Sequence, residues 1–222
     1  SQAQTRALER HVQALAAMPG LRAVIVTGAG RAFCAGGDLL EFEQALAAGT
    51  LVETLSYNQH VLTMVEDLPV PVIAAVNGVA IAGGLELILC CDIVLAAEDA
   101  RIGDGHARYG IVPAGGATVR LLERLSPSHA AQLFYTAATV DAATLRHWGL
   151  VNEIVASDHL MDRAMRVARE IAARSPEAIR HIKALTRRAD PRRTARLRAE
   201  IEHFAEHVEG KDLARGLAAF RQ

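Results

Sequence analysis

Two glycine-rich turns constrain the fold of this chain more than any other feature of its sequence. They lie at residues 32–38 and 77–86, and each follows an apolar, β-like run and leads into a helical pattern. Glycine allows a sharp turn because it has no Cβ, and N–H groups at the start of a helix favour negative charge. We interpret the two turns as paired backbone donors that converge on one oxygen atom, which makes an oxyanion site.

The hydrophobic periodicity predicts an α/β fold. Strand, glycine turn and helix recur at a spacing of about 50 residues, a pattern typical of stacked ββα units around a largely parallel sheet covered by helices. The expected helices lie at residues 5–18, 51–67 and 85–91, and the expected strands lie at residues 23–26, 72–76 and 92–96.

The domain organisation follows from a change in character along the chain. From Leu121 onward Arg and Ala dominate, the patterns are helical, and prolines punctuate them. We expect an α/β core over residues 1–156, followed by a C-terminal helical extension over residues 157–222 rather than a second domain.

Composition and charge exclude several classes of protein. The net charge of -1 gives no overall attraction for nucleic acid or an anionic membrane, and no apolar run approaches the roughly 20 residues of a membrane span. The three cysteines, Cys34, Cys90 and Cys91, lack the spacing of a metal site or a redox motif. We therefore expect a cytoplasmic enzyme without a metal or disulfides.

Several segments, taken together in this order, are similar to the crotonase (enoyl-CoA hydratase/isomerase) superfamily. The matching segments are residues 24–39, which include Ala-Gly-Gly-Asp at 35–38, residues 71–93, Gly-Ile-Val-Pro-Ala-Gly-Gly at 110–116, and Trp-Gly-Leu-Val-Asn-Glu-Ile-Val at 148–155. The resemblance implies a crotonase-like spiral of ββα repeats, acyl-CoA substrates and an enolate intermediate. It also implies that the backbone N–H groups of Gly37 and Gly83 form the oxyanion hole.

Glu86 is the main candidate for a catalytic base. It stands three residues after Gly83, where hydratases of the family carry the first of two catalytic glutamates. Its neighbours include Leu85 and Leu87, so the carboxylate is expected to be buried, and burial without a partner is costly. We predict a raised pKa for Glu86, which suits proton transfer near neutral pH.

The position of the second hydratase glutamate is where this sequence departs from the family. His106 occupies that position, and a histidine either donates or accepts a proton at neutral pH. The two-carboxylate water mechanism therefore does not follow from the resemblance, and a structural or substrate-shaping His106 stays open. Asp104 and Tyr109 are candidates to orient His106 or to line the acyl pocket, with Asp104 expected on the same face as His106.

The resemblance also implies where CoA binds. Ala35 and Asp38 lie beside the first glycine turn, although Asp38 is expected chiefly to cap the following helix. In the family's last helix, basic and aromatic residues often reach the CoA adenine and phosphates, which points here to Lys211, Phe220 and Arg221. Family members usually open with a strand pair and an Asn-Arg-Pro-type segment that is missing here, so we expect part of the CoA site outside this sequence.

These observations favour one function and leave alternatives open. The leading expectation is an enoyl-CoA hydratase or dehydratase of fatty acid metabolism that needs no cofactor beyond the CoA of its substrate and assembles as a trimer or a dimer of trimers. The alternatives are another crotonase-type reaction using Glu86 and His106 (isomerisation, decarboxylation, or hydrolysis of a thioester or β-diketone) and a non-catalytic acyl-CoA binder.

Overall fold

Two small sheets, joined by repeated strand pairs, form the framework of the fold. The computed structural model describes residues 1–186 and 191–220, except for the side chain of Phe220. The strands are β1 (Val24–Thr27), β2 (Ala32–Cys34), β3 (Val72–Val76), β4 (Val79–Ile81), β5 (Ile93–Ala97), β6 (Arg101–Gly103), β7 (Thr139–Asp141) and β8 (Glu153–Val155).

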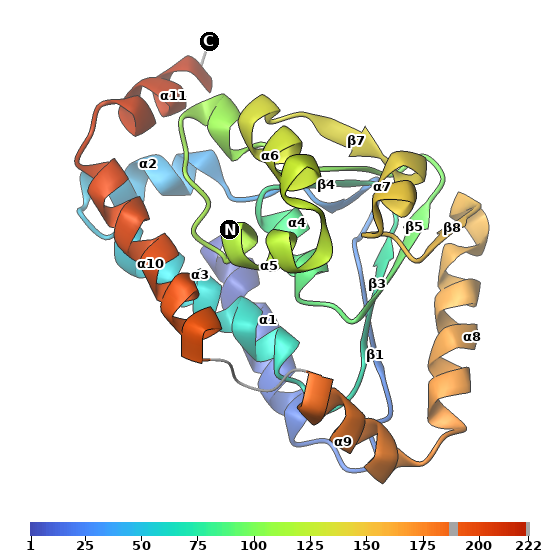
Figure 1. Cartoon of the computed structure of the whole chain (residues 1–222). Coiled ribbons are helices and arrows are strands. Elements are labelled where there is room, and N and C mark those ends of the chain that lie inside the picture. Colours follow the sequence, from blue (N-terminus) through green and yellow to red (C-terminus); the bar gives the residue numbers. More distant parts are fainter. Residues whose placement is uncertain (187–190, 221–222) are drawn as a thin grey trace.

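The helices surround these sheets (Figure 1). The α-helices are α1 (Gln2–Ala16), α2 (Leu39–Ala47), α3 (Leu51–Glu66), α4 (Gly83–Leu89), α5 (Ala117–Arg124), α6 (Pro127–Thr136), α7 (Ala142–Trp148), α8 (Leu160–Ala172), α9 (Pro176–Thr186), α10 (Pro191–Val208) and α11 (Asp212–Phe220). Two 3₁₀ helices, η1 (His106–Tyr109) and η2 (Ser157–His159), complete the described elements.

Strands β1 to β6 alternate between the two sheets, and β7 follows β6 in the same sheet before β8 returns to the first, which gives the chain its spiral course. One sheet has the order β1-β3-β5-β8 and is parallel throughout. The other has the order β2-β4-β6-β7, with only the β6–β7 pair antiparallel. Each strand pair therefore places one strand in each sheet, one level above the preceding pair. This arrangement confirms the predicted α/β spiral of ββα repeats.

The amide side chain of Asn77 connects the corners of two successive strand pairs. Asn77 lies in the β3–β4 corner, where its Oδ1 accepts a hydrogen bond from the N–H of Gly28 at 2.9 Å and its Nδ2 donates to the carbonyl of Gly30 at 2.9 Å. A Cβ on Gly78 would lie 2.2 Å from the carbonyl oxygen of Arg31, so the corners approach more closely than any other residue allows. The Asn-Gly pair thus fixes how successive levels stack.

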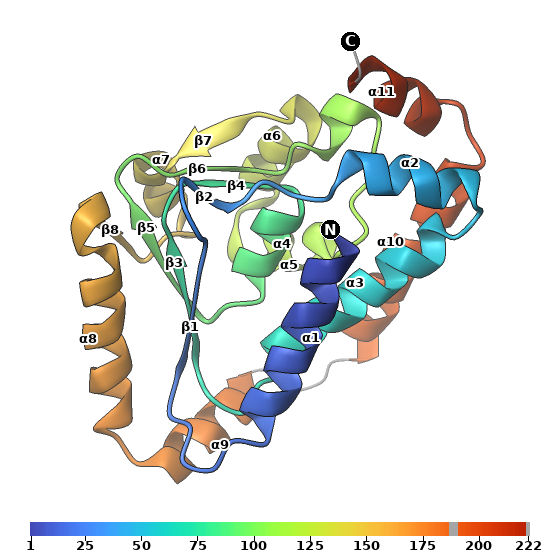
Figure 2. The ribbon, with the colours of Figure 1, turned by 180° about the vertical axis from the view of Figure 1, so that it is seen from behind.

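The core lies between the β1-β3-β5-β8 sheet and the helices on both of its sides. All five residues of β3 are buried, as expected for a parallel strand covered on both faces. The helix α8 packs against β1, β3 and β5, whereas α1, α3 and α10 lie on the other side of these strands (Figures 1 and 2). The predicted helical extension, residues 157–222, therefore starts with η2 and then α8, a helix that covers this sheet.

The remaining helices of the extension fold back over the same chain. Helix α10 packs against α3 and α5, and α11 packs against η1 and α2. His207 on α10 lies with its Nε2 2.6 Å from the carbonyl oxygen of Gly110, and a Cβ on Gly216 would lie 1.8 Å from the carbonyl oxygen of Tyr109. The C-terminal helices thus contact the segment that carries His106.

Most predicted elements match the structure, with differences at their ends. The helix expected at residues 85–91 is α4, which begins at Gly83 and ends at Leu89, so Cys90 and Cys91 follow it. The short strands β2, β4 and β6 have no separate counterpart in the expected strands, because three residues are too few to show a period. No helix in the described ranges has the length and apolar character of a membrane span.

Candidate active site

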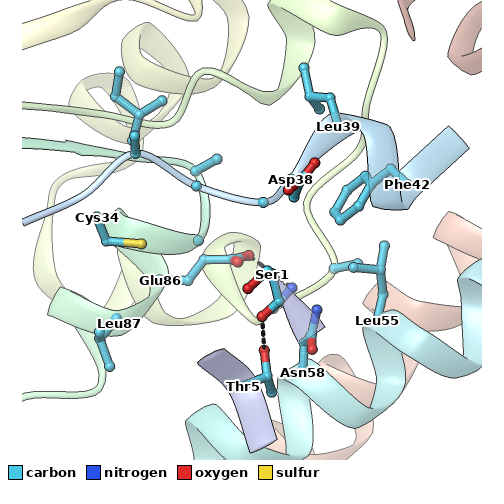
Figure 3. A pocket seen from close by; sticks show the side chains of 18 of the residues that line it. Ser1, Thr5, Cys34, Asp38, Leu39, Phe42, Leu55, Asn58, Glu86 and Leu87 are labelled. Atoms are coloured by element: carbon cyan, nitrogen blue, oxygen red, sulfur yellow. Dashed lines mark hydrogen bonds between the residues drawn. The ribbon is translucent and has the colours of Figure 1, made fainter. Parts of the chain in front are cut away.

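A cavity of about 930 Å³ lies between the two glycine turns, α3 and η1. In Figure 3, Glu86 reaches into this cavity from one side, while Phe42 and Leu55 lie on the other. The predicted site residues that line it are Ala35, Gly37, Asp38, Gly83, Glu86, His106 and Tyr109. The fold therefore brings both glycine turns and both candidate acid–base residues to one cavity.

The two glycine turns touch one another at the wall of this cavity. A Cβ on Gly36 would lie 3.1 Å from the carbonyl oxygen of Ile81, and a Cβ on Gly84 would lie 2.1 Å from that of Cys34. Among the described residues, the N–H groups of Gly37 and Gly83 donate to no protein acceptor. Both groups are therefore available to a ligand in the cavity.

Backbone strain is concentrated next to the second glycine turn. Ala82, the N-cap residue of α4, has φ 52° and ψ -116°, a conformation that favours glycine. It lies directly before Gly83 and lines the cavity. No local sequence pattern announces this strain, which is typical of positions where the backbone is arranged for function.

Asp38 caps the helix after the first glycine turn, as the sequence predicts. Its Oδ1 accepts hydrogen bonds from the N–H groups of Leu40 at 3.0 Å and Glu41 at 3.3 Å. This cap fixes where α2 begins, and therefore the course of the turn that carries Gly37.

The Glu86 carboxylate is buried and accepts a hydrogen bond from the backbone. The N–H of Gly115 donates to its Oε1 at 2.8 Å. Burial raises the pKa of Glu86, and the charges of Glu200 and Asp104 raise it further, while the His106 charge and the Gly115 hydrogen bond lower it. The net result is a raised pKa, in agreement with the sequence prediction.

Gly115 is a site residue that the sequence reasoning missed. A Cβ at this position would lie 2.2 Å from Oε2 of Glu86 and 2.8 Å from its Oε1. Only glycine therefore leaves room for the carboxylate where it lies. The signal in the sequence is the Gly115-Gly116 pair, which lies in one of the segments that resemble the family.

Asp104 holds His106 from behind. The Nδ1 of His106 lies 2.9 Å from Oδ1 of Asp104, and the His106 N–H donates to Oδ2 at 3.3 Å. Because an ionised carboxylate only accepts hydrogen bonds, Nδ1 carries the proton and Nε2 is left for the cavity. The contact arises from a turn at Gly105, with φ 72°, and not from the strand alternation on which it was predicted.

The surroundings of His106 favour its charged form. Burial lowers the pKa of His106, but the hydrogen bond and charge of Asp104, together with the charges of Glu86 and Glu200, outweigh burial. The net effect is a raised pKa for His106. The cavity therefore contains two groups suited to acid–base chemistry, Glu86 and His106, each with a raised pKa.

The other predicted site residues differ in how they lie relative to the cavity. Asp104 is almost completely buried behind His106, whereas Tyr109 lines the cavity at the end of η1. Lys211 is exposed just before α11 and does not line the cavity. Arg221 and the side chain of Phe220 lie outside the described residues.

The sequence of this chain matches the model of a known protein family. The family model described as enoyl-CoA hydratase/isomerase matches residues 4–222. The chain is 42% identical over 173 residues, 78% of its length and 68% of the relative's, to (7aS)-7a-methyl-1,5-dioxo-2,3,5,6,7,7a-hexahydro-1H-indene-carboxyl-CoA hydrolase of Mycobacterium tuberculosis. It is 38% identical over 167 residues, 75% of its length and 64% of the relative's, to crotonyl-CoA hydratase of Syntrophomonas wolfei.

A solved structure shows the same architecture. The crystal structure of an enoyl-CoA hydratase from Bacillus anthracis superimposes with a TM-score of 0.81 at 34% identity, covering 100% of this chain and 86% of that one. The family model, the sequence relatives and this structure agree with one another. The chain therefore belongs to the enoyl-CoA hydratase/isomerase family, the crotonase superfamily.

Proposed function

We propose that this chain is an acyl-CoA enzyme that hydrates a 2-enoyl-CoA or catalyses the reverse dehydration through a thioester enolate. The observation that carries the proposal is the arrangement of Glu86 and His106. Each is buried, each is held from behind by a hydrogen bond, and both line the cavity between the two glycine turns. Names of relatives, which include crotonyl-CoA hydratase and carnitinyl-CoA dehydratase, support this reaction class.

In the dehydration direction, Glu86 removes a proton from C2 of a 3-hydroxyacyl-CoA. The electron pair moves into the thioester carbonyl, where the N–H groups of Gly37 and Gly83 stabilise the oxyanion. The enolate then expels the C3 oxygen, and protonated His106 gives it a proton so that water leaves. Hydration is the reverse, with His106 taking a proton from water and Glu86 delivering one to C2.

The Asp104–His106 pair favours a second candidate function, hydrolysis of an acyl-CoA. A histidine fixed by a carboxylate through Nδ1 is suited to remove a proton from water at Nε2, so that the resulting hydroxide attacks a carbonyl carbon. Attack on the thioester would release CoA, whereas attack on a β-keto carbonyl would break a carbon–carbon bond and release the enolate into the oxyanion hole. The name of the 42% identical relative, a carboxyl-CoA hydrolase, supports this alternative.

Finer expectations belong to the same proposal. The family resemblance supports a trimer or a dimer of trimers in the cytoplasm, a role in fatty acid metabolism, and CoA contacts from Lys211, Phe220 and Arg221. No cofactor is needed besides the CoA that the substrate carries. Light scattering on the purified protein measures the assembly.

The experiment is mass spectrometry of saturated, enoyl and β-keto acyl-CoAs incubated with the protein in heavy water. Deuterium at the α-carbon that disappears in Glu86→Gln supports enolate chemistry at this carboxylate. Water added to an enoyl-CoA identifies a hydratase, and free CoA or a cleaved acyl chain identifies a hydrolase. Tight binding without exchange or product across the panel would contradict the proposal and favour an acyl-CoA binder.

A further inference from the structure

Helix α10 places a buried carboxylate directly behind the catalytic cavity. Glu200 is 5% exposed and does not line the cavity. Its Oε2 accepts hydrogen bonds from the N–H of Thr118 at 2.8 Å and from the Thr118 hydroxyl, while its Oε1 accepts from the N–H of Gly116 and from Nε2 of Gln59 at 3.4 Å. Such a set of donors fixes the position of this carboxylate.

The donors that Glu200 binds belong to the turn that holds Glu86. The peptide unit between Gly115 and Gly116 is hydrogen-bonded on both sides. Its N–H donates to Glu200, and its carbonyl accepts from Nη1 of Arg120 at 2.7 Å. The preceding N–H of the turn, that of Gly115, donates to Glu86. Glu200 is therefore one peptide unit away from the hydrogen bond that orients the catalytic carboxylate.

The Gly115–Gly116 turn is closely packed against the side chains around it. A Cβ on Gly115 would clash with Glu86, and a Cβ on Gly116 would lie 1.8 Å from Nη1 of Arg120. Gly116 also has φ 96°, a conformation that disfavours side chains. Loss of the Glu200 contacts would therefore be transmitted to the Gly115 N–H.

We propose that Glu200 is a positioning residue for Glu86, acting through the backbone of the Gly115–Gly116 turn. The inference rests on the proposed role of Glu86 as the proton-transfer group, since Glu200 itself touches no substrate-accessible surface of the cavity. It assigns to α10, far along the sequence from α4, a part in placing the catalytic carboxylate.

Electrostatics supply an independent support for this link. The charge of Glu200 raises the pKa of Glu86 by more than the Gly115 hydrogen bond lowers it, although both effects are smaller than burial. The other charged groups around Glu86 are His106 and Asp104, and Arg120 on α5. Removal of the Glu200 charge therefore lowers the pKa of Glu86, an effect that a neutral side chain at this position would not have.

The test compares Glu200→Gln with Glu202→Gln, its control. Both variants exchange a carboxylate for an amide on α10, but Glu202 is exposed. The Glu86 carboxyl is titrated by ¹³C NMR in protein labelled at the glutamate carboxyl carbons, with Glu86→Gln used to assign its signal. Alongside, α-proton exchange of an acyl-CoA substrate is measured for kcat and KM.

In Glu200→Gln we expect the Glu86 titration midpoint to move to lower pH and kcat for exchange to fall by about tenfold or more, with KM unchanged. Glu202→Gln should match the wild type in both measurements. If the two variants behave alike, the inference is wrong even where Glu86 is shown to be the base. If the wild type exchanges no α-proton with any substrate, the proposed function fails, whereas an unmoved Glu86 midpoint in Glu200→Gln would contradict the Glu200 inference on its own.

A second variant covers the case in which Glu200→Gln does not fold. Glu200→Asp keeps the charge but shortens the side chain by one methylene, which withdraws the acceptor oxygens from the turn. We expect a lower kcat for exchange with a smaller movement of the Glu86 midpoint. Wild-type kcat in folded Glu200→Asp would overturn the positioning role.

Discussion

Glu86 accepts a hydrogen bond of 2.8 Å from the N–H of Gly115, a residue on which a Cβ would lie 2.2 Å from the same carboxylate. Gly115 does not have a positive φ, so alanine is able to adopt its backbone conformation. The replacement Gly115→Ala therefore displaces Glu86 without imposing backbone strain. A displacement of about 1 Å costs roughly 100-fold in rate, and we expect kcat to fall by about this factor while the protein still folds.

Gly49→Ala is the control for this variant. Gly49 faces open space but has φ 70°, so alanine there imposes a general backbone cost away from the cavity. It should lower the thermal midpoint and leave kcat per folded molecule unchanged. Wild-type kcat in Gly115→Ala would show that Glu86 does not need its present position.

The plot of kcat against pH should be bell-shaped. Its acidic limb should lie above the ordinary pKa of a glutamate, and its alkaline limb should lie above the ordinary pKa of a histidine. The proposed dehydration needs Glu86 ionised and His106 protonated, so activity is lost on the acidic side as Glu86 takes up a proton. It is lost on the alkaline side as His106 releases one. The pKa of Glu86 is raised above 4.5 and that of His106 above 6.5. An acidic limb at or below 4.5 would contradict Glu86 as the ionised base.

Asp104→Asn should move the alkaline limb of that profile to lower pH. Burial lowers the pKa of His106, and the hydrogen bond and charge of Asp104 are the largest opposing effects, so their removal lowers that pKa. Asparagine also no longer enforces the proton on Nδ1, and we expect kcat to fall by about 100-fold. Asp158→Asn, an exposed change of the same kind, is the control. An unchanged alkaline limb would assign that limb to another group.

Glu86→Gln should stabilise the protein at neutral pH. Because the pKa of Glu86 is raised in the folded state, that state holds the proton more tightly than the unfolded chain does. The stability associated with it is fully present below pH 4.5 and is lost as pH rises through the folded-state pKa. Glutamine avoids this loss, and a gain of about 1 kcal/mol corresponds to roughly 2–4 °C for a chain of this length.

Thermal unfolding at pH 4 and pH 7 checks this expectation. The two proteins should unfold at the same temperature at pH 4, where Glu86 is protonated, and differ at pH 7. A lower midpoint for Glu86→Gln at pH 7 would mean that the folded protein stabilises the charge of Glu86, contrary to a raised pKa.

Features that depend on residues close together in the sequence could be predicted from it. The buried strands, the cap at Asp38 and the carboxylate at Glu86 all follow from neighbours along the chain, and the structure contains them. The Asp104–His106 contact was expected for the wrong geometric reason, since a turn and not an extended strand creates it. Placement of Gly37 and Gly83 at one cavity required the family resemblance, because no periodicity aligns turns from different repeats.

Contacts between segments that lie far apart in the sequence could not be predicted from local patterns. Glu200 binds Gly116 across 84 positions of sequence, and such a contact leaves no local signature. One signal was still available, because Glu200 shares a helical face with Leu197 and Phe204, both buried. A charged residue in an apolar stripe calls for a buried partner. The strain at Ala82 had no comparable signal.

The last prediction concerns the attachment of α9 to the sheet. Lys183 is 8% exposed, and its Nζ donates to the carbonyl of Val70 at 2.8 Å and to Oδ2 of Asp92 at 2.8 Å. Lys183→Met keeps much of the side-chain volume but leaves two acceptors without this donor, so we expect a loss of about 2–4 kcal/mol in the free energy of unfolding. Arg180→Met, on the exposed face of α9, should change it little. Since α9 does not line the catalytic cavity, kcat should be unchanged, and a fall in kcat without a loss of stability would contradict a purely structural role for Lys183.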